Sequence, residues 1–414
     1  MGRNIAGKAL LLEHAWFLIS ALAIAHSICP AQASKQPEPG KTKVIVLGVG
    51  HSSQLVAESY QPAVLRAFFD RVRPEAICIE RSPQEFARND FYEFTYEQQY
   101  LTIPYAKEHH IPIYPVDWLP SAEDSMLAYN LPDLEKPPFV RAASGFLGFM
   151  SFPDKVDLNI DLFYGETESN RNQQQVFANT PSPQARSDFA RRLYLYRTFM
   201  QAMRILRSVN DNRGRTILVV IGSLHKNDIE QVLKAENSVE IIQPSSFGRP
   251  DAESIMKAVK REDLLAVAAF NLLGVQSRTG NINWEWLKRT IEGLGIGPST
   301  AETLLLKTRL QVLIKQISSQ QALDGYTKVY EMAEASEQFT WTGVKDRSRV
   351  DSYFDPFGNL SVKQRAQLEM ARENFKLMRA SQVEEARRQL QSQLSPTKAH
   401  QLAAYWEEYV ARMF

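Results

Sequence analysis

Residues 44–53, VIVLGVGHSS, decide the fold that we expect for this chain. They begin as an apolar, β-branched run, which is typical of a buried strand. The run ends in a Gly-x-x-His pattern that places His51 just beyond the strand. A second stretch, ILVVIGSLHK at 217–226, repeats the pattern from Gly222 to His225. We therefore expect two buried strands, each with a histidine at its carboxyl end.

The segments around these two stretches alternate between strand-like and helix-like patterns. Further strands are expected at 76–80 (AICIE), 111–118 (IPIYPVDW) and 239–244 (VEIIQP), with helices at 55–72, 94–110 and 183–209. Such alternation is typical of an α/β fold with a central, mainly parallel sheet and flanking helices. Residues 119–182 are rich in proline, glycine and aromatic residues without a clean period, so we interpret them as an insertion or lid.

The length of 414 residues suggests one large domain with an appendage, or two to three units. We expect an α/β domain over 43–249 and an all-helical C-terminal region over 250–414. Two helices of that region have capping-box spacings at their starts, Ser299 with Glu302 and Ser361 with Gln364.

The first 33 residues have the pattern of a signal peptide. A basic start with Arg3 and Lys8 precedes the apolar segment 15–25, and the small residues at 31–33 fit a cleavage site. The apolar segment has 11 residues, too few to span a bilayer alone. We expect cleavage after Ala33, a polar linker over 34–42, a periplasmic or secreted protein and no stable membrane span; an uncleaved anchor is the alternative.

Charge and cysteine content limit the classes of partner and nucleophile that we expect. Cleavage after Ala33 leaves 46 basic and 46 acidic residues, so no electrostatic reason exists to expect nucleic acid as a partner. Cys29 leaves with the signal, and Cys78 is then the single cysteine of the mature chain. We expect Cys78 to be a buried strand thiol rather than a nucleophile.

Ionisable residues follow four of the expected strands. His51, Glu80, Asp117 and His225 each come at or just after a strand end. In a doubly wound sheet the carboxyl ends of the strands line the ligand crevice, so these groups are expected to converge. Two histidines and a carboxylate commonly hold a divalent metal with open positions, and such a metal lowers the pKa of bound water. The simpler interpretation is that each histidine only bonds locally at its strand end.

The order of these motifs resembles a known superfamily. It contains TraB and the pheromone-shutdown proteins, the TIKI Wnt-cleaving proteases, the erythromycin esterases and the ChaN-like proteins. The similar features are LGVGH (47–51), RPEAICIE (73–80) and VIGSLH (220–225), within residues 43 to about 245. The resemblance implies a metal-assisted or His/Glu-based hydrolase of amide or ester bonds, acting on an unknown peptide or small molecule.

The same resemblance assigns roles to single residues. His51, Glu80 and His225 would be ligands of a divalent metal of unknown identity or the acid/base set, with Glu80 as ligand or general base. Arg197 fits the arginine that the family places before the second Gly-x-x-His strand, and Arg171 is its competitor for holding a substrate carboxylate or an oxyanion.

Two further residues and two further function classes stay open. Asp117 is a candidate for orienting a histidine or contacting substrate, and Ser52 for contacting substrate or the loop beside His51. A non-catalytic member of the same superfamily, which binds a ligand or metal, would have nearly the same sequence. Less favoured is nucleic-acid binding by residues 284–310, where LGIGPSTAETLL resembles a helix-hairpin-helix module.

Overall fold

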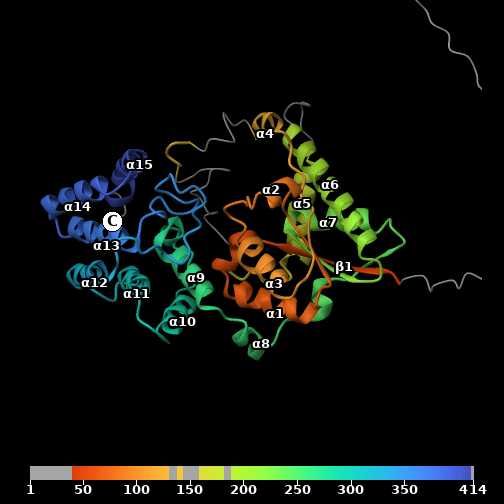
Figure 1. Ribbon diagram of the computed structural model, residues 1–414, viewed down its shortest axis with the longest axis horizontal. Coiled ribbons are helices and arrows are strands. Elements are labelled where there is room, and N and C mark those ends of the chain that lie inside the picture. The colour runs from red at the N-terminus through yellow and green to blue at the C-terminus, as the bar shows by residue number, and fades with distance from the viewer. Residues whose placement is uncertain (1–39, 130–137, 143–157, 181–187, 412–414) are drawn as a thin grey trace, which may run out of the picture. The chain divides into compact units, whose positions relative to one another are not determined.

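Five parallel strands form one sheet in the order β3-β2-β4-β1-β5, which confirms the predicted α/β class (Figure 1). The strands are β1 Thr42–Val49, β2 Ala76–Ile79, β3 Ile113–Pro115, β4 Thr216–Gly222 and β5 Val239–Ile241. The computed structural model describes residues 40–129, 138–142, 158–180 and 188–411. The described residues belong to one compact unit, Gly40–Phe414. The predicted signal peptide and most of the predicted linker lie outside them.

The two faces of the sheet are covered by different helices (Figure 1). Leu47 and Val49 of β1 belong to a core that also contains apolar residues of α1 (Pro62–Val72) and α3 (Ile103–Glu108). Val44 and Val46 belong to a second core with residues of α6 (Phe189–Asp211) and α7 (Ser223–Leu233). Alternate residues of a strand point to opposite faces, so an apolar run such as β1 is the pattern that both cores require.

The connections after β1 and β4 leave the sheet toward opposite faces. The chain after β1 leads to α1, and the chain after β4 leads directly into α7. Because β1 and β4 are hydrogen-bonded neighbours, their diverging connections open a crevice at the carboxyl ends of both strands. His51 and His225 follow these two strands.

The other elements of this part are short, and several lie within the predicted insertion. They are η1 His51–Leu55, η2 Glu58–Tyr60, α2 Pro83–Ala87, the π-helix η3 Glu97–Thr102, α4 Ala122–Tyr129, η4 Tyr164–Glu166 and α5 Glu168–Asn179. The insertion, residues 119–182, thus contains regular helices. Its segments 130–137, 143–157 and 181–182 lie outside the described residues, and its role as a lid stays a prediction.

Residues beyond 250 form helices, as predicted. They are α8 Ala252–Lys257, α9 Arg261–Leu273, η7 Val275–Arg278, α10 Trp284–Leu294, α11 Ala301–Leu313, α12 Ser319–Met332, α13 Val362–Lys376, α14 Ala380–Ser392, α15 Pro396–Trp406 and the π-helix η8 Glu407–Ala411, preceded by η6 Pro244–Phe247. Among the described residues, no helix combines the length and apolar character needed to cross a membrane.

One of the two predicted capping boxes is correct. Ser361 accepts from the Gln364 amide, and the Gln364 side chain accepts from Ser361. The Ser299 prediction is wrong by one residue, because Thr300 is the cap and forms its box with Thr303. Glu302 instead accepts hydrogen bonds from the amide and hydroxyl of Thr340, a partner that is distant in sequence.

Candidate active site

His51 begins the turn that follows β1. Its backbone is left-handed, with φ of 44°, which is uncommon for a residue other than glycine and frequent at functional sites. The Nδ1 atom lies 2.9 Å from Oε1 of Glu97. Glu97 is fully buried at the start of the π-helix η3, a helix type that is frequent at functional sites. The ring edge also packs against Phe94. These contacts aim Nε2 of His51 at the crevice.

Glu80 comes directly after β2 and occupies the centre of the crevice. The Nε2 atoms of His51 and His225 lie 3.9 and 3.6 Å from its two carboxylate oxygens. Arg197 donates to Oε1 at 2.9 Å, and the backbone amide of Gly222 donates to Oε2 at 2.6 Å. Side chains that are far apart in the sequence thus meet at one carboxylate.

His225 lies in the first turn of α7 and is 5 % exposed. Its ring stacks on Tyr194, and its Nδ1 lies 2.7 Å from the hydroxyl of Thr198. That hydroxyl donates to the carbonyl oxygen of Tyr194 at 2.9 Å, and a carbonyl can only accept. Nδ1 must then donate to Thr198, which leaves the lone pair of His225 on Nε2, facing the crevice.

The two glycines of the Gly-x-x-His motifs allow close approach at the site. A Cβ on Gly222 would lie 3.1 Å from Nε2 of His51 and 3.2 Å from Oε2 of Glu80. A Cβ on Gly48 would lie 3.0 Å from the Cα of Ser223 and 3.2 Å from the Cα of Gly165. All four distances are shorter than ordinary van der Waals contacts. Gly222 therefore makes room for the catalytic candidates, and Gly48 for the backbone segments beside them.

The buried Asp117 and the partly exposed Arg197 form an ion pair beside Glu80. Arg197 extends from α6 and donates to both oxygens of Asp117, at 2.8 and 2.7 Å. Gln201, one turn further along α6, donates to Asp117 at 2.7 Å, and Arg204 donates to the Asp117 backbone carbonyl. This places Asp117 next to Arg197 rather than next to either histidine. Nη1 of Arg197 forms no hydrogen bond with the described residues and remains able to contact a substrate.

The pKa values of the two histidines are displaced in opposite directions. Burial lowers the pKa of His51, but the charge and hydrogen bond of Glu97 and the charge of Glu80 outweigh burial and hold it above 6.5. Burial lowers the pKa of His225 to about 4, although Glu80 acts in the other direction. Near neutral pH, His225 is therefore an unprotonated base, and His51 is the more readily protonated of the pair.

The predicted metal ligands His51, Glu80 and His225 come together, and metal binding by them stays a prediction. Within the described residues, no three His, Cys, Asp or Glu side chains are placed to coordinate a metal ion. Both oxygens of Glu80 already accept hydrogen bonds, and the guanidinium of Arg197 puts a positive charge beside them. A divalent cation at the same carboxylate would face that charge.

The other predicted residues lie around this centre or apart from it. Ser52 donates to the carbonyl of Phe94 and shares a hydrogen bond with the Tyr353 hydroxyl, so it holds the loop. Arg171 lines a separate cavity, whose lining contains none of His51, Glu80 and His225. Cys78 is buried in β2, and burial raises the pKa of its thiol to about 12, which agrees with the structural role predicted for it.

Three residues of the site were not identified from the sequence: Glu97, Thr198 and Gln201. Thr198 and Gln201 follow Arg197 on α6, so helical spacing from Arg197 was an available signal for Gln201. Glu97 had no such signal, because its segment reads as an ordinary amphipathic helix and a π-helical turn has no pattern of its own.

Together, the fold and this centre define the class: a doubly wound α/β protein with a His–Glu–His cluster at the carboxyl ends of neighbouring strands. Comparisons with known protein families, with curated proteins and with solved structures found no match. The resemblance to the TraB, TIKI and erythromycin-esterase superfamily therefore stays a prediction.

Proposed function

We propose that this protein is an exported hydrolase of amide or ester bonds that activates water between His51, Glu80 and His225. The observation that carries the proposal is a pair of imidazoles that face one carboxylate with oppositely displaced pKa values. A hydrolase needs one group that accepts a proton from water and one that gives a proton to the leaving group. Export rests on the signal-peptide pattern of residues 1–33 alone.

In this proposal each histidine has one task. Nε2 of His225 takes a proton from water as the water oxygen attacks the carbonyl carbon. The protonated Nε2 of His51 then donates a proton to the departing amine or alcohol. Departure of the amine or alcohol completes cleavage. The proton that His225 took from water then passes to His51, which restores the starting protonation of both histidines. Glu80 orients the water between the two rings, since its carboxylate lies within 4 Å of both.

Arg197 is proposed to stabilise the negative charge that develops on the carbonyl oxygen. Two of its nitrogens are held by Glu80 and Asp117, which fixes the guanidinium in place before substrate binds. Nη1, which has no hydrogen-bond partner among the described residues, can then donate to the oxyanion without reorganisation. Glu97 and Thr198 act through the histidines, because each fixes which nitrogen faces the crevice.

The metal-assisted form of the proposal, with His51, Glu80 and His225 as ligands of a divalent ion, requires Arg197 to release Glu80. Such an ion would polarise the substrate carbonyl and lower the pKa of bound water. The two forms make different predictions for Arg197→Ala. The acid/base form predicts that the variant loses activity, and the metal-assisted form predicts that it binds a metal more easily.

The test is an activity screen of the purified chain against chromogenic esters and fluorogenic peptides, combined with elemental analysis for bound metal. His51→Ala and His225→Ala should each lower the rate by about 100-fold or more, the range for losing an acid or base. His109→Ala is the matched control, since His109 is exposed at the end of α3, where it stacks on Tyr105 and bonds to the Tyr105 backbone carbonyl. Circular dichroism checks that every variant is folded.

Different results separate the function classes. Hydrolysis lost in both histidine variants, without bound metal, supports the acid/base form; stoichiometric metal that is lost in the same variants supports the metal-assisted form. A folded protein that cleaves none of these substrates, but binds a metal or ligand through the same histidines, would instead be the non-catalytic member. Retention on DNA that depends on Gly295 and Gly297 would favour the helix-hairpin-helix alternative.

A further inference from the structure

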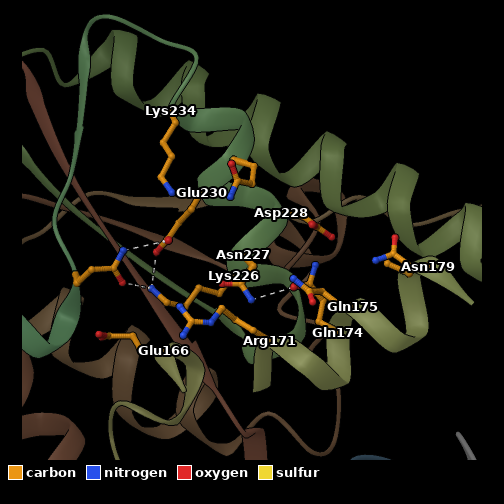
Figure 2. Close-up of a pocket in the computed structure, with 13 residues that line it drawn as sticks. Glu166, Arg171, Gln174, Gln175, Asn179, Lys226, Asn227, Asp228, Glu230 and Lys234 are labelled. Atoms are coloured by element: carbon orange, nitrogen blue, oxygen red, sulfur yellow. Dashed lines mark hydrogen bonds and ion pairs between the residues drawn. The ribbon is translucent and has the colours of Figure 1, made fainter. Parts of the chain in front are cut away.

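A polar cavity of about 530 Å³ lies between α5 and α7 (Figure 2). None of its lining residues belongs to the His–Glu–His centre. Its lining comes from η4, α5, α7 and the segment after β5. Lys226 follows His225 in α7, so consecutive residues of one helical turn serve the cavity and the proposed active site. The hydrolase proposal makes no use of this cavity.

The floor of the cavity is a lysine whose hydrogen bonds are all used within the protein. Lys226 is 1 % exposed, and its ammonium donates to the carbonyl of Val46, to Glu230 and, at 3.0 Å, to Gln243. An ammonium has three donors, so none remains for a ligand. Gln243 in turn donates to the second oxygen of Glu230 at 3.1 Å. The floor is therefore a closed, rigid network.

The walls of the cavity carry two cationic side chains that, unlike Lys226, have no partner among the described residues. Arg171 extends from α5 and Lys234 directly follows α7, and both line the cavity (Figure 2). Neither side chain forms an ion pair or hydrogen bond with the described residues, and both are exposed. The nearby carboxylate of Glu166 accepts from the amide and hydroxyl of Ser245 and forms no ion pair with Arg171 or Lys234 among the described residues. Two unpaired cations over one cavity favour an anionic group between them.

A third group of the cavity is an acceptor. One carboxylate oxygen of Asp228 is buried without a hydrogen-bond partner in the described structure. Burial also raises the pKa of Asp228, although its hydrogen bond with Gln174 acts in the other direction. A buried oxygen without a partner is costly, and a donor on a bound ligand would satisfy it.

The rest of the lining suits a ligand body with many hydrogen-bonding groups. Ala178 is the single apolar residue among the thirteen that line the cavity. Six others carry amides: Gln174, Gln175, Asn179, Asn227, Gln231 and Gln243. An apolar ligand would gain little here, whereas hydroxyl or amide groups can both donate to and accept from these side chains.

We propose that this cavity binds a small polar anion: a carboxylate or phosphate group held by Arg171 and Lys234, on a body rich in hydroxyl or amide groups. The amides contact that body, and Asp228 accepts from one of its donors. Acidic sugars and sugar phosphates have this chemistry, and the two anionic groups are distinguished by experiment.

The test is isothermal titration calorimetry of the full chain with four probes. Glucuronate and glucose 6-phosphate present the two anionic groups on a hydroxyl-rich body, glucose is the body without an anion, and inorganic phosphate is the anion without a body. At least one anionic sugar should bind, at least about tenfold more tightly than glucose and phosphate. The tighter of the two identifies the preferred anionic group.

Matched variants locate the binding. Replacing the cavity pair, Arg171→Gln with Lys234→Gln, should weaken binding of that sugar by about tenfold or more. Replacing two exposed cations on other helix surfaces, Arg207→Gln with Lys328→Gln, lowers the net charge equally and should leave the affinity unchanged. Circular dichroism confirms folding of both double variants.

Three outcomes would overturn the inference. Neither anionic sugar binds the folded protein; phosphate alone binds as tightly as glucose 6-phosphate, which is plain charge attraction; or the cavity double variant keeps its affinity. None of these results bears on hydrolysis, because no residue of the cavity lining belongs to the His–Glu–His centre.

Discussion

His51 and His225 face the same carboxylate but differ in their second partner. His51 has the charged Glu97 on Nδ1, whereas His225 has the neutral hydroxyl of Thr198. A buried carboxylate beside an imidazole stabilises the protonated form, and a hydroxyl cannot replace that charge. This difference, rather than the shared Gly-x-x-His motif, separates the protonation of the two rings.

We therefore expect Glu97→Gln to lower the pKa of His51. The folded pKa of His51 lies above 6.5, so the stability it contributes is fully present below pH 6.5 and is lost as the pH rises through the folded pKa. Removing the Glu97 charge should shift that loss to lower pH. The measurement is an NMR titration of the His51 ring, together with urea unfolding at several pH values.

The matched control is Glu240→Gln, an exposed carboxylate on β5 that should leave the titration unchanged. His225 should titrate only near pH 4 and remain neutral near neutral pH. If His51 titrates at the same pH in Glu97→Gln as in the unmodified protein, then Glu97 does not set its protonation.

The sequence predicted much of the centre because its residues follow strand ends. His51, Glu80 and His225 do come together, and Arg197 does contact Glu80. The partners that tune them were not predicted, because Glu97 lies on a helix whose π-helical turn leaves no trace in the residue pattern. Arg171 lines a separate cavity instead of the centre, because packing of α5 decides which residues its side chain meets.

Helix α13 carries a buried carboxylate whose arginine partners come from two helices. Its Glu369 is fully buried and accepts hydrogen bonds from Arg365 at 2.9 Å and from Arg372 at 2.7 and 2.9 Å. Nη1 of Arg309, on α11, lies 3.4 Å from Oε2 of Glu369, and Arg365 also donates to Asp355. A single carboxylate thus holds two helices together through three buried guanidinium groups.

We expect Glu369→Gln to destabilise the protein by about 3–5 kcal/mol, the usual cost of leaving buried charges without their partner. Burial raises the pKa of Glu369, but the three arginines lower it by more than burial raises it, so the pKa lies below 4.5. The stability that ionised Glu369 contributes is therefore present above its pKa in the unfolded chain and is lost as the pH falls through its pKa in the folded protein. Urea unfolding at neutral and acidic pH measures both effects.

Glu331→Gln, at an exposed position on α12, is the control and should change stability by less than about 0.5 kcal/mol. A Glu369→Gln variant as stable as this control would show that the arginine cluster contributes nothing net. The apolar periodicity of α13 predicted that it packs, but nothing in the sequence pairs Arg309 with Glu369.

The helical region and the sheet share one core. Phe270 of α9 and Leu65 of α1 belong to the same buried cluster. Asn271 donates to the backbone carbonyl of Leu55, and Tyr96 donates to Asp263 at 2.7 Å. The part of the chain that carries the proposed active site therefore relies on residues beyond 250 for its packing.

We expect a chain of residues 40–249 to lose cooperative unfolding, because the apolar face of α9 that completes its core is missing. Residues 40–414 should unfold cooperatively, and near-UV circular dichroism with urea compares the two. Cooperative unfolding of residues 40–249 alone would contradict this expectation and establish the boundary predicted at residue 249 as that of an independent domain.

Local patterns in the sequence were sufficient for the fold class and for the three central residues. Strand, helix and turn signals are encoded over short stretches, and residues at parallel strand ends must lie at one edge of the sheet. The opposed protonation of the histidines, the contact between Arg197 and Glu80, and the polar cavity depend on partners distant in sequence. Burial and charge act through space, so only the tertiary structure decides which groups meet and which proton each one holds.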